Sequence, residues 1–215
     1  MERLVKLNNK EYKFPYWGPL VLDFDLEDEI ISLLLEKGKE NHKEHLDARI
    51  KLVAVIDKAY YYEEIEWFYP LFSPYVNTYI DAVSGYKTNA FNNQNLPTEW
   101  KLDGLWINYQ QSNEYNPPHS HSGDLSFVIY VQVPEEILEE NEKTNHKHNN
   151  PGPGMITFDL GPEMQFGISA STMMPRVGRA FMFPAWLPHH VLAFKSDVER
   201  ISVSGNIIFK YDKNY

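Results

Sequence analysis

Hydrophobic and polar positions follow two different patterns in the two parts of the chain. In the first hundred residues, apolar side chains recur at helical spacing from about residue 25 to 37 and again from 65 to 83, while residues 52–62 are rich in β-forming side chains. Asp25 is a candidate N-cap for the first helix and Gly38 a candidate stop. This part therefore predicts two helices with one strand between them.

From about residue 103, short strand-like runs recur, and clusters of Gly, Pro and Asn separate them. The runs are LWINYQQ, LSFVIYVQV, MITFDL, RAFMFP, HHVLAF and RISVSGNIIF. Many short strands in one part of a chain predict a β-sandwich or a small barrel, and helices can cover one outer face of it. The expected class is mainly β with flanking helices (α+β), in one domain of residues 1–215, where residues 1–100 support a core at 103–209.

The polar stretch 135–154 interrupts this series of strands and predicts a long loop. It contains His146 and His148, which we interpret as solvated loop residues because nothing in the pattern places them on a rigid element.

Composition and charge exclude several classes of protein. The chain has no cysteine, which excludes disulfides, thiolate zinc sites and cysteine-ligated iron–sulfur clusters and fits a reducing cytoplasm. Its net charge of −10 disfavours non-specific nucleic-acid binding. The N-terminal segment lacks the apolar centre of a secretory signal, and no apolar stretch approaches the roughly 20 residues that span a bilayer.

Histidines carry the clearest chemical signal. His119 and His121 alternate just before a strand, so both imidazoles face one side if the segment is extended. His189 and His190 begin a later strand-like run, and a barrel can bring such distant strand ends together. Imidazole suits iron, zinc, copper and nickel, so these residues alone leave the metal open. A polar loop would also show this spacing by chance.

Four ordered segments are similar to those of a known family. WINYQQSNEYNPPHSH, LSFVIYVQVP, GRAFMFPAWLPHHV and ERISVSGNI resemble the iron(II)- and 2-oxoglutarate-dependent oxygenases, and the chain looks most like a bacterial and phage-encoded branch near the prolyl 4-hydroxylase-like group. The resemblance covers roughly residues 103–209. It implies a double-stranded β-helix, which is a jelly-roll or cupin-like barrel, with N-terminal helices packed on one face.

The resemblance also implies an iron site. His119 matches the first ligand position and His189 the last, with His190 as the second choice. The family's pattern places a carboxylate at position 121, where this chain has histidine. This departure implies a three-histidine site that includes His121, with Asp124 as the alternative carboxylate ligand. Asp124 could instead be an outer partner of an imidazole or a turn residue.

A cosubstrate site follows from the same resemblance. Arg200 lies eleven residues after His189 and matches the cation that binds the distal carboxylate of 2-oxoglutarate. The planar guanidinium fork of arginine suits a carboxylate, and Ser202 shares its strand face. Tyr109 is a candidate third contact. Without the other motifs, Arg200 would read as a surface residue paired with an acid.

The resemblance thus implies a dioxygenase, a hydroxylase that uses Fe(II), 2-oxoglutarate and O2 and converts 2-oxoglutarate to succinate. Two alternatives stay open: a cupin-like metalloenzyme that does not use 2-oxoglutarate, and a non-catalytic jelly-roll binding or virion-associated protein. The sequence gives neither the substrate nor the oligomeric state; we expect a small molecule or a peptidyl side chain, and the acidic charge disfavours a nucleic acid. The expected location is cytoplasmic, in the host cytoplasm if a phage encodes the chain.

Overall fold

The computed structural model describes the backbone of residues 2–7, 10–15, 18–91, 96–145, 152–163, 165 and 167–211. His146 and His148, which we interpreted as loop residues, lie outside these described ranges.

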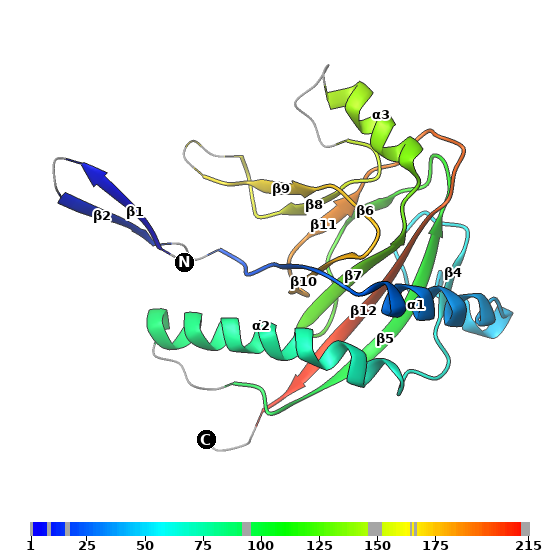
Figure 1. Ribbon diagram of the computed structural model, residues 1–215, viewed down its shortest axis with the longest axis horizontal. Coiled ribbons are helices and arrows are strands. Elements are labelled where there is room, and N and C mark those ends of the chain that lie inside the picture. The colour runs from blue at the N-terminus through cyan, green and yellow to red at the C-terminus, as the bar shows by residue number, and fades with distance from the viewer. Residues whose placement is uncertain are drawn as a thin grey trace.

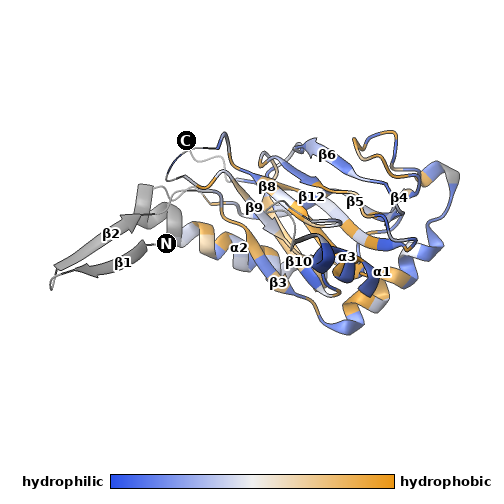
Figure 2. Cartoon of the chain, turned by 90° about the horizontal axis from the view of Figure 1, so that it is seen from above, coloured by the Kyte–Doolittle hydropathy of each residue, from blue (hydrophilic) through white to orange (hydrophobic). Residues whose placement is uncertain are grey.

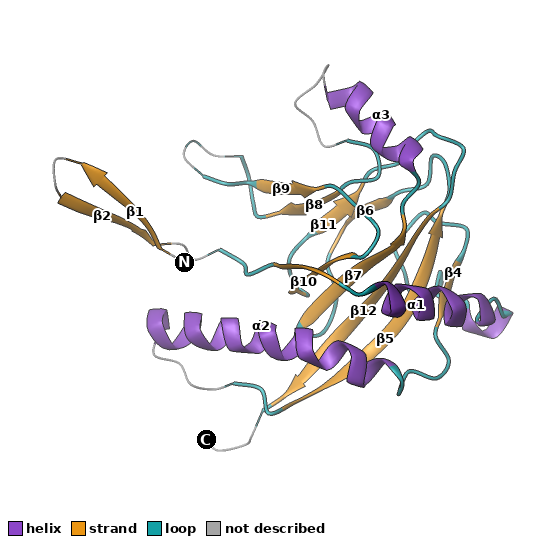
Figure 3. Ribbon diagram, viewed as in Figure 1, coloured by secondary structure: helices purple, strands orange, loops and turns teal. Residues whose placement is uncertain are grey.

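Two antiparallel sheets form the body of the described chain (Figure 1, Figure 3). The larger sheet has the strand order β3-β10-β7-β12-β5-β4 and the smaller one β6-β11-β8-β9, as expected for a jelly-roll barrel. A separate hairpin pairs β1 with β2. The strands are Glu2–Leu7 (β1), Lys10–Pro15 (β2), Leu22–Asp25 (β3), Ala59–Tyr61 (β4), Glu99–Gln110 (β5), Asn116–His119 (β6), Leu125–Gln132 (β7), Ile156–Asp159 (β8), Ala170–Met173 (β9), Arg179–Pro184 (β10), His189–Val191 (β11) and Arg200–Lys210 (β12).

Three α-helices accompany the sheets in the described residues, Asp28–Glu40 (α1), Phe68–Phe91 (α2) and Glu135–Asn145 (α3), with a short 3-10 helix at Glu44–Leu46. Apolar side chains of α1 and α2 pack against the larger sheet in the main hydrophobic core. α3, in contrast, is mostly hydrophilic (Figure 2). Among the described residues, no helix combines the length and the apolar character that crossing a bilayer requires.

Strand β7 separates two cores, because side chains on both of its faces are buried. Phe127 and Ile129 face the core beneath the helices, whereas Tyr130 belongs to a second core with residues of β8 and β10. The neighbouring strand β12 is buried over most of its length in the same way. The polar side chains of the candidate site lie beside this second core, between the two sheets.

The helices differ at their ends from the sequence-based prediction. α1 begins at Asp28 instead of Asp25, because residues 22–25 belong to β3 and pair with β10. It continues past Gly38, where a glycine lets α1 approach β5 closely. A Cβ at this position would lie 2.4 Å from a side-chain carbon of Ile107. The second helix also starts later than expected, at Phe68, and runs to Phe91.

One strand prediction is confirmed only in part, and one loop prediction is wrong. Only Ala59–Tyr61 of the expected strand 52–62 pairs in the sheet. The expected loop 135–154 begins with α3, a mostly polar helix whose Ile137 is buried. Five short or edge strands (β1, β2, β3, β6 and β9) had no clear signal, since edge strands need no continuous apolar run.

Candidate active site

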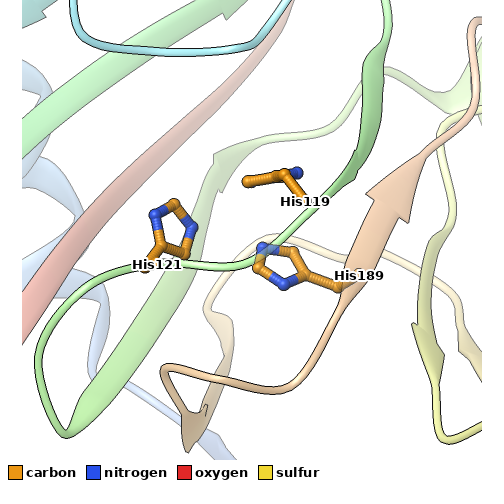
Figure 4. Close-up of side chains that lie close together, drawn as sticks. All are labelled: His119, His121 and His189. Atoms are coloured by element: carbon orange, nitrogen blue, oxygen red, sulfur yellow. The ribbon is translucent and has the colours of Figure 1, made fainter.

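Three histidines lie together, two on neighbouring strands of the smaller sheet and one just after the first of these strands (Figure 4). His119 ends β6 and His189 begins β11, and the two are direct partners in the antiparallel register. His121 follows two residues after β6, and its backbone N–H is bonded to the carbonyl of Ala185 at 2.8 Å. One ring nitrogen from each of the three histidines lies within 4.8 Å of the other two. Ligands at about 2.1 Å from one metal are at most about 4.2 Å apart, so small ring rotations would complete a site.

Local sequence sets the tautomer of two of these rings. His119 Nδ1 is 2.7 Å from the carbonyl of Pro117, and His189 Nδ1 is 3.0 Å from the carbonyl of Leu187. A carbonyl only accepts, so Nδ1 carries the proton and Nε2 keeps a lone pair for a metal. In both cases a proline immediately precedes the histidine and restricts the backbone before it. The same local arrangement therefore prepares both rings as ligands.

The environment of the trio favours neutral imidazoles. Burial lowers the pKa of His119, and it lowers the pKa of His121 to about 4 and that of His189 to about 3, with the neighbouring rings adding to the effect at His121 and His189. A neutral imidazole is the form that binds a metal. At neutral pH the trio can therefore bind a cation without first releasing protons.

The two other candidate ligands lie outside the trio. Asp124 Oδ2 accepts a hydrogen bond from the backbone N–H of Phe209 at 2.7 Å, so this carboxylate links the start of β7 to β12. His190 Nδ1 is 2.8 Å from Asp159 Oδ2, on the opposite side of β11 from His189. The structure thus brings together His119, His121 and His189 and leaves Asp124 and His190 apart from them.

The three histidines line a cavity that is also lined by the buried Arg200. Arg200 is 4 % exposed, and no carboxylate pairs with it among the described residues. Nη1 donates to the carbonyl of Gly154 at 2.5 Å, and Nε has no partner in the described part of the chain. Burial lowers the pKa of Arg200, yet arginine stays charged at neutral pH. A buried cation without a counter-ion favours an anionic ligand.

Two side chains beside Arg200 face the same cavity. Ser202 lies two residues along β12 and lines the cavity with Asn108, its partner on β5. The ring of Tyr130 lies under the guanidinium, with 5.4 Å between its centroid and Arg200 Cζ. Its hydroxyl is buried without a partner among the described residues, and burial raises its pKa. This neutral donor is therefore free to bond to a ligand in the cavity that Arg200 also lines.

Tyr109, the expected third contact of 2-oxoglutarate, does not line the cavity with Arg200. It pairs with Ile201 across β5 and β12 and lies in the helix-covered core. Its ring packs against Tyr60 and His42. Because neighbours on a strand point to opposite faces, a residue opposite Ile201 cannot share the face of Arg200 and Ser202. Among the described residues, Tyr130 and not Tyr109 lines the cavity together with Arg200.

Comparison with known proteins agrees with this geometry. Residues 104–206 match the family model described as "Putative 2OG-Fe(II) oxygenase", a segment that contains the three histidines and Arg200. The fold is similar to that of a viral collagen prolyl hydroxylase from Paramecium Bursaria Chlorella virus-1 (14% identity, TM-score 0.50, 87% of this chain and 94% of that one). It is also similar to a prolyl hydroxylase from Trichoplax adhaerens (11% identity, TM-score 0.50, 91% and 84%). No curated protein matches the sequence.

Proposed function

On the premise that residues 104–206 form a 2OG-Fe(II) oxygenase domain, we propose that His119, His121 and His189 hold iron(II) and that Arg200 binds the distal carboxylate of 2-oxoglutarate. One observation carries this proposal: three imidazoles whose pKa values are lowered by burial line the same cavity as the buried Arg200, which has no acidic partner in the described chain. The enzyme is then a hydroxylase.

Different residues of the cavity have different proposed roles in such an enzyme. Iron(II), when bound with 2-oxoglutarate and O2, supplies the oxidation that hydroxylates a C–H bond while 2-oxoglutarate becomes succinate and CO2. Arg200 would bind the distal carboxylate of 2-oxoglutarate and so orient the cosubstrate. Ser202 and Tyr130 would offer hydroxyl donors from the cavity wall beside Arg200. The aromatic and aliphatic residues of the second core keep water away from this end of the cavity.

The outer part of the cavity is the proposed substrate entrance. It is lined by a segment at residues 51–54 and by Ile56, whose side chains are mostly apolar, with Lys51 as its basic group. This lining supports a substrate that presents an aliphatic C–H bond, either a small molecule or a peptidyl side chain. The reducing cytoplasm stays our proposal for the location.

The first hundred residues are proposed to support the oxygenase domain within one folding unit. β3 and β4 occupy the two edges of the larger sheet, and α1 and α2 cover one of its faces. The main core is shared between these helices and the central strands, so neither part buries its apolar residues alone.

The proposed activity predicts a spectroscopic result for the unaltered protein. Anaerobic addition of 2-oxoglutarate to the iron(II)-loaded protein should produce the weak visible charge-transfer band of an iron–oxoglutarate chelate. Succinate, which lacks the keto oxygen, should produce no band and is the matched control. Iron binding without any band or calorimetric heat on adding 2-oxoglutarate would favour a cupin-like metalloenzyme instead.

Replacing Tyr130 by phenylalanine separates a cosubstrate role from packing. The hydroxyl has no partner among the described residues, so Tyr130→Phe should leave the melting temperature unchanged or slightly higher. A hydrogen bond to a charged group contributes about 1.5–3 kcal/mol, so 2-oxoglutarate should bind roughly 10- to 100-fold more weakly in calorimetry.

Tyr109→Phe is the control for this substitution, because Tyr109 lies on the opposite face of the sheet. Equal 2-oxoglutarate affinity for Tyr130→Phe and the unaltered protein would remove Tyr130 from the cosubstrate site.

A further inference from the structure

The guanidinium of Arg200 is anchored by a backbone carbonyl. Its Nη1 donates to Gly154, which lies in the turn before β8 with a φ of 71°. A guanidinium carries its N–H groups in a rigid planar fork, so fixing one of them sets the direction of the others. The position of the Gly154 carbonyl therefore decides where the remaining donors of Arg200 point.

Helix α3 holds this turn through a buried amide. Asn141 is fully buried, and its Nδ2 donates to the carbonyl of Pro153 at 2.5 Å, one residue before Gly154. Its Oδ1 lies against Gly152, where a Cβ would come within 1.7 Å of that oxygen. Side chain and turn are thus fitted to each other, and the turn cannot shift without moving the amide.

The same helix also holds the segment that leads into Arg200. The carboxylate of Glu140 accepts hydrogen bonds from the backbone N–H groups of Lys195 and Ser196, each at 3.0 Å, and from the Ser196 hydroxyl at 2.8 Å. β12 begins four residues later with Arg200 itself. α3 therefore contacts both the turn that accepts the arginine's hydrogen bond and the turn that precedes the arginine.

We propose that Asn141 is a positioning residue for 2-oxoglutarate, acting through the Gly154 carbonyl and Arg200. This role rests on the proposed function, because it presupposes that Arg200 binds the cosubstrate. The apparent surface helix α3 is then part of the cosubstrate site, although it contributes no side chain to the cavity lining.

Asn141→Leu tests this role, because leucine fills a similar volume but cannot donate to Pro153. Calorimetric titration of 2-oxoglutarate into the anaerobic iron(II)-loaded protein should show about three- to tenfold weaker binding, the effect expected from losing the neutral hydrogen bond to Pro153, while iron content is unchanged. Gly152→Ala should act in the same direction, because its Cβ displaces the amide. If Asn141→Leu does not fold, Gly152→Ala carries the test alone.

Two comparisons distinguish positioning from a general loss of stability. Val76→Ala removes core packing in α2, away from the cavity, and should lower the melting temperature without changing 2-oxoglutarate affinity. In an Arg200→Lys background, which lacks the fork, Asn141→Leu should change the affinity less than about twofold.

An equal fold-change in both backgrounds, or unchanged affinity in Asn141→Leu and Gly152→Ala, would overturn the role of Asn141 and leave the proposed function intact. If the unaltered protein binds no 2-oxoglutarate, the proposed function is wrong, and the role of Asn141 that rests on it is overturned with it.

Discussion

Arg200→Ala is expected to weaken 2-oxoglutarate binding by roughly two to four orders of magnitude while iron(II) still binds stoichiometrically. The cosubstrate's carboxylate would lose its buried cationic partner, and an unpaired buried charge costs about 3–5 kcal/mol, at about 1.4 kcal/mol per tenfold. Iron should be unaffected because Arg200 is not among the three ring ligands. Calorimetry of 2-oxoglutarate binding and metal analysis measure the two quantities separately.

Arg200→Lys should give an intermediate affinity, since lysine keeps the charge but loses the planar fork. Arg176→Ala is the matched control, because this arginine forms an exposed ion pair with Asp25 at 2.6 Å and does not line the cavity. Its 2-oxoglutarate affinity should equal that of the unaltered protein. Equal affinity in Arg200→Ala would contradict the assignment of the cosubstrate site.

Replacing His119, His121 or His189 by alanine should abolish stoichiometric iron(II) binding and leave the fold intact. Each ring is one of only three protein ligands proposed for the metal, and the Nδ1 bonds at two of them orient the ring that is removed. Anaerobic iron titration followed by metal analysis measures the loss, and circular dichroism shows whether the fold is retained. Unchanged iron content in these variants would contradict the assignment of the metal ligands.

Two neighbouring residues supply the controls for the metal site. His190→Ala should keep iron, because His190 pairs with Asp159 on the other side of β11. Asp124→Asn should reduce iron affinity about tenfold or less, since its hydrogen bond from Phe209 can still form with an amide oxygen. A crystal structure with an Asp124 oxygen at roughly 2.0–2.2 Å from the metal would reverse the ligand assignment.

Sequence alone was sufficient for features that depend on neighbours along the chain. Alternation put His119 with His121 and Arg200 with Ser202, because side chains two apart on an extended segment share a face. The apolar runs at β7, β10 and β12 predicted the central strands of the larger sheet, which are buried on both faces. α3 was missed because only Ile137 among its residues is a buried apolar side chain, which is too little for a helical period.

Only the tertiary structure decided which face of a strand meets the cavity. β5 is buried on both sides near its end, so its hydrophobic pattern could not tell whether Tyr109 or Asn108 faces Arg200. The register of β5 with β12 places Asn108, and not Tyr109, on the face of Ser202. In the same way, the pairing of β11 with β6 places His189, and not His190, opposite His119. The contact between Tyr130 and Arg200 also joins residues far apart in the chain. So do the hydrogen bonds from Asn141 to Pro153 and from Arg200 to Gly154. Local periodicity groups residues by face, but long-range strand pairing and packing determine what each face contacts.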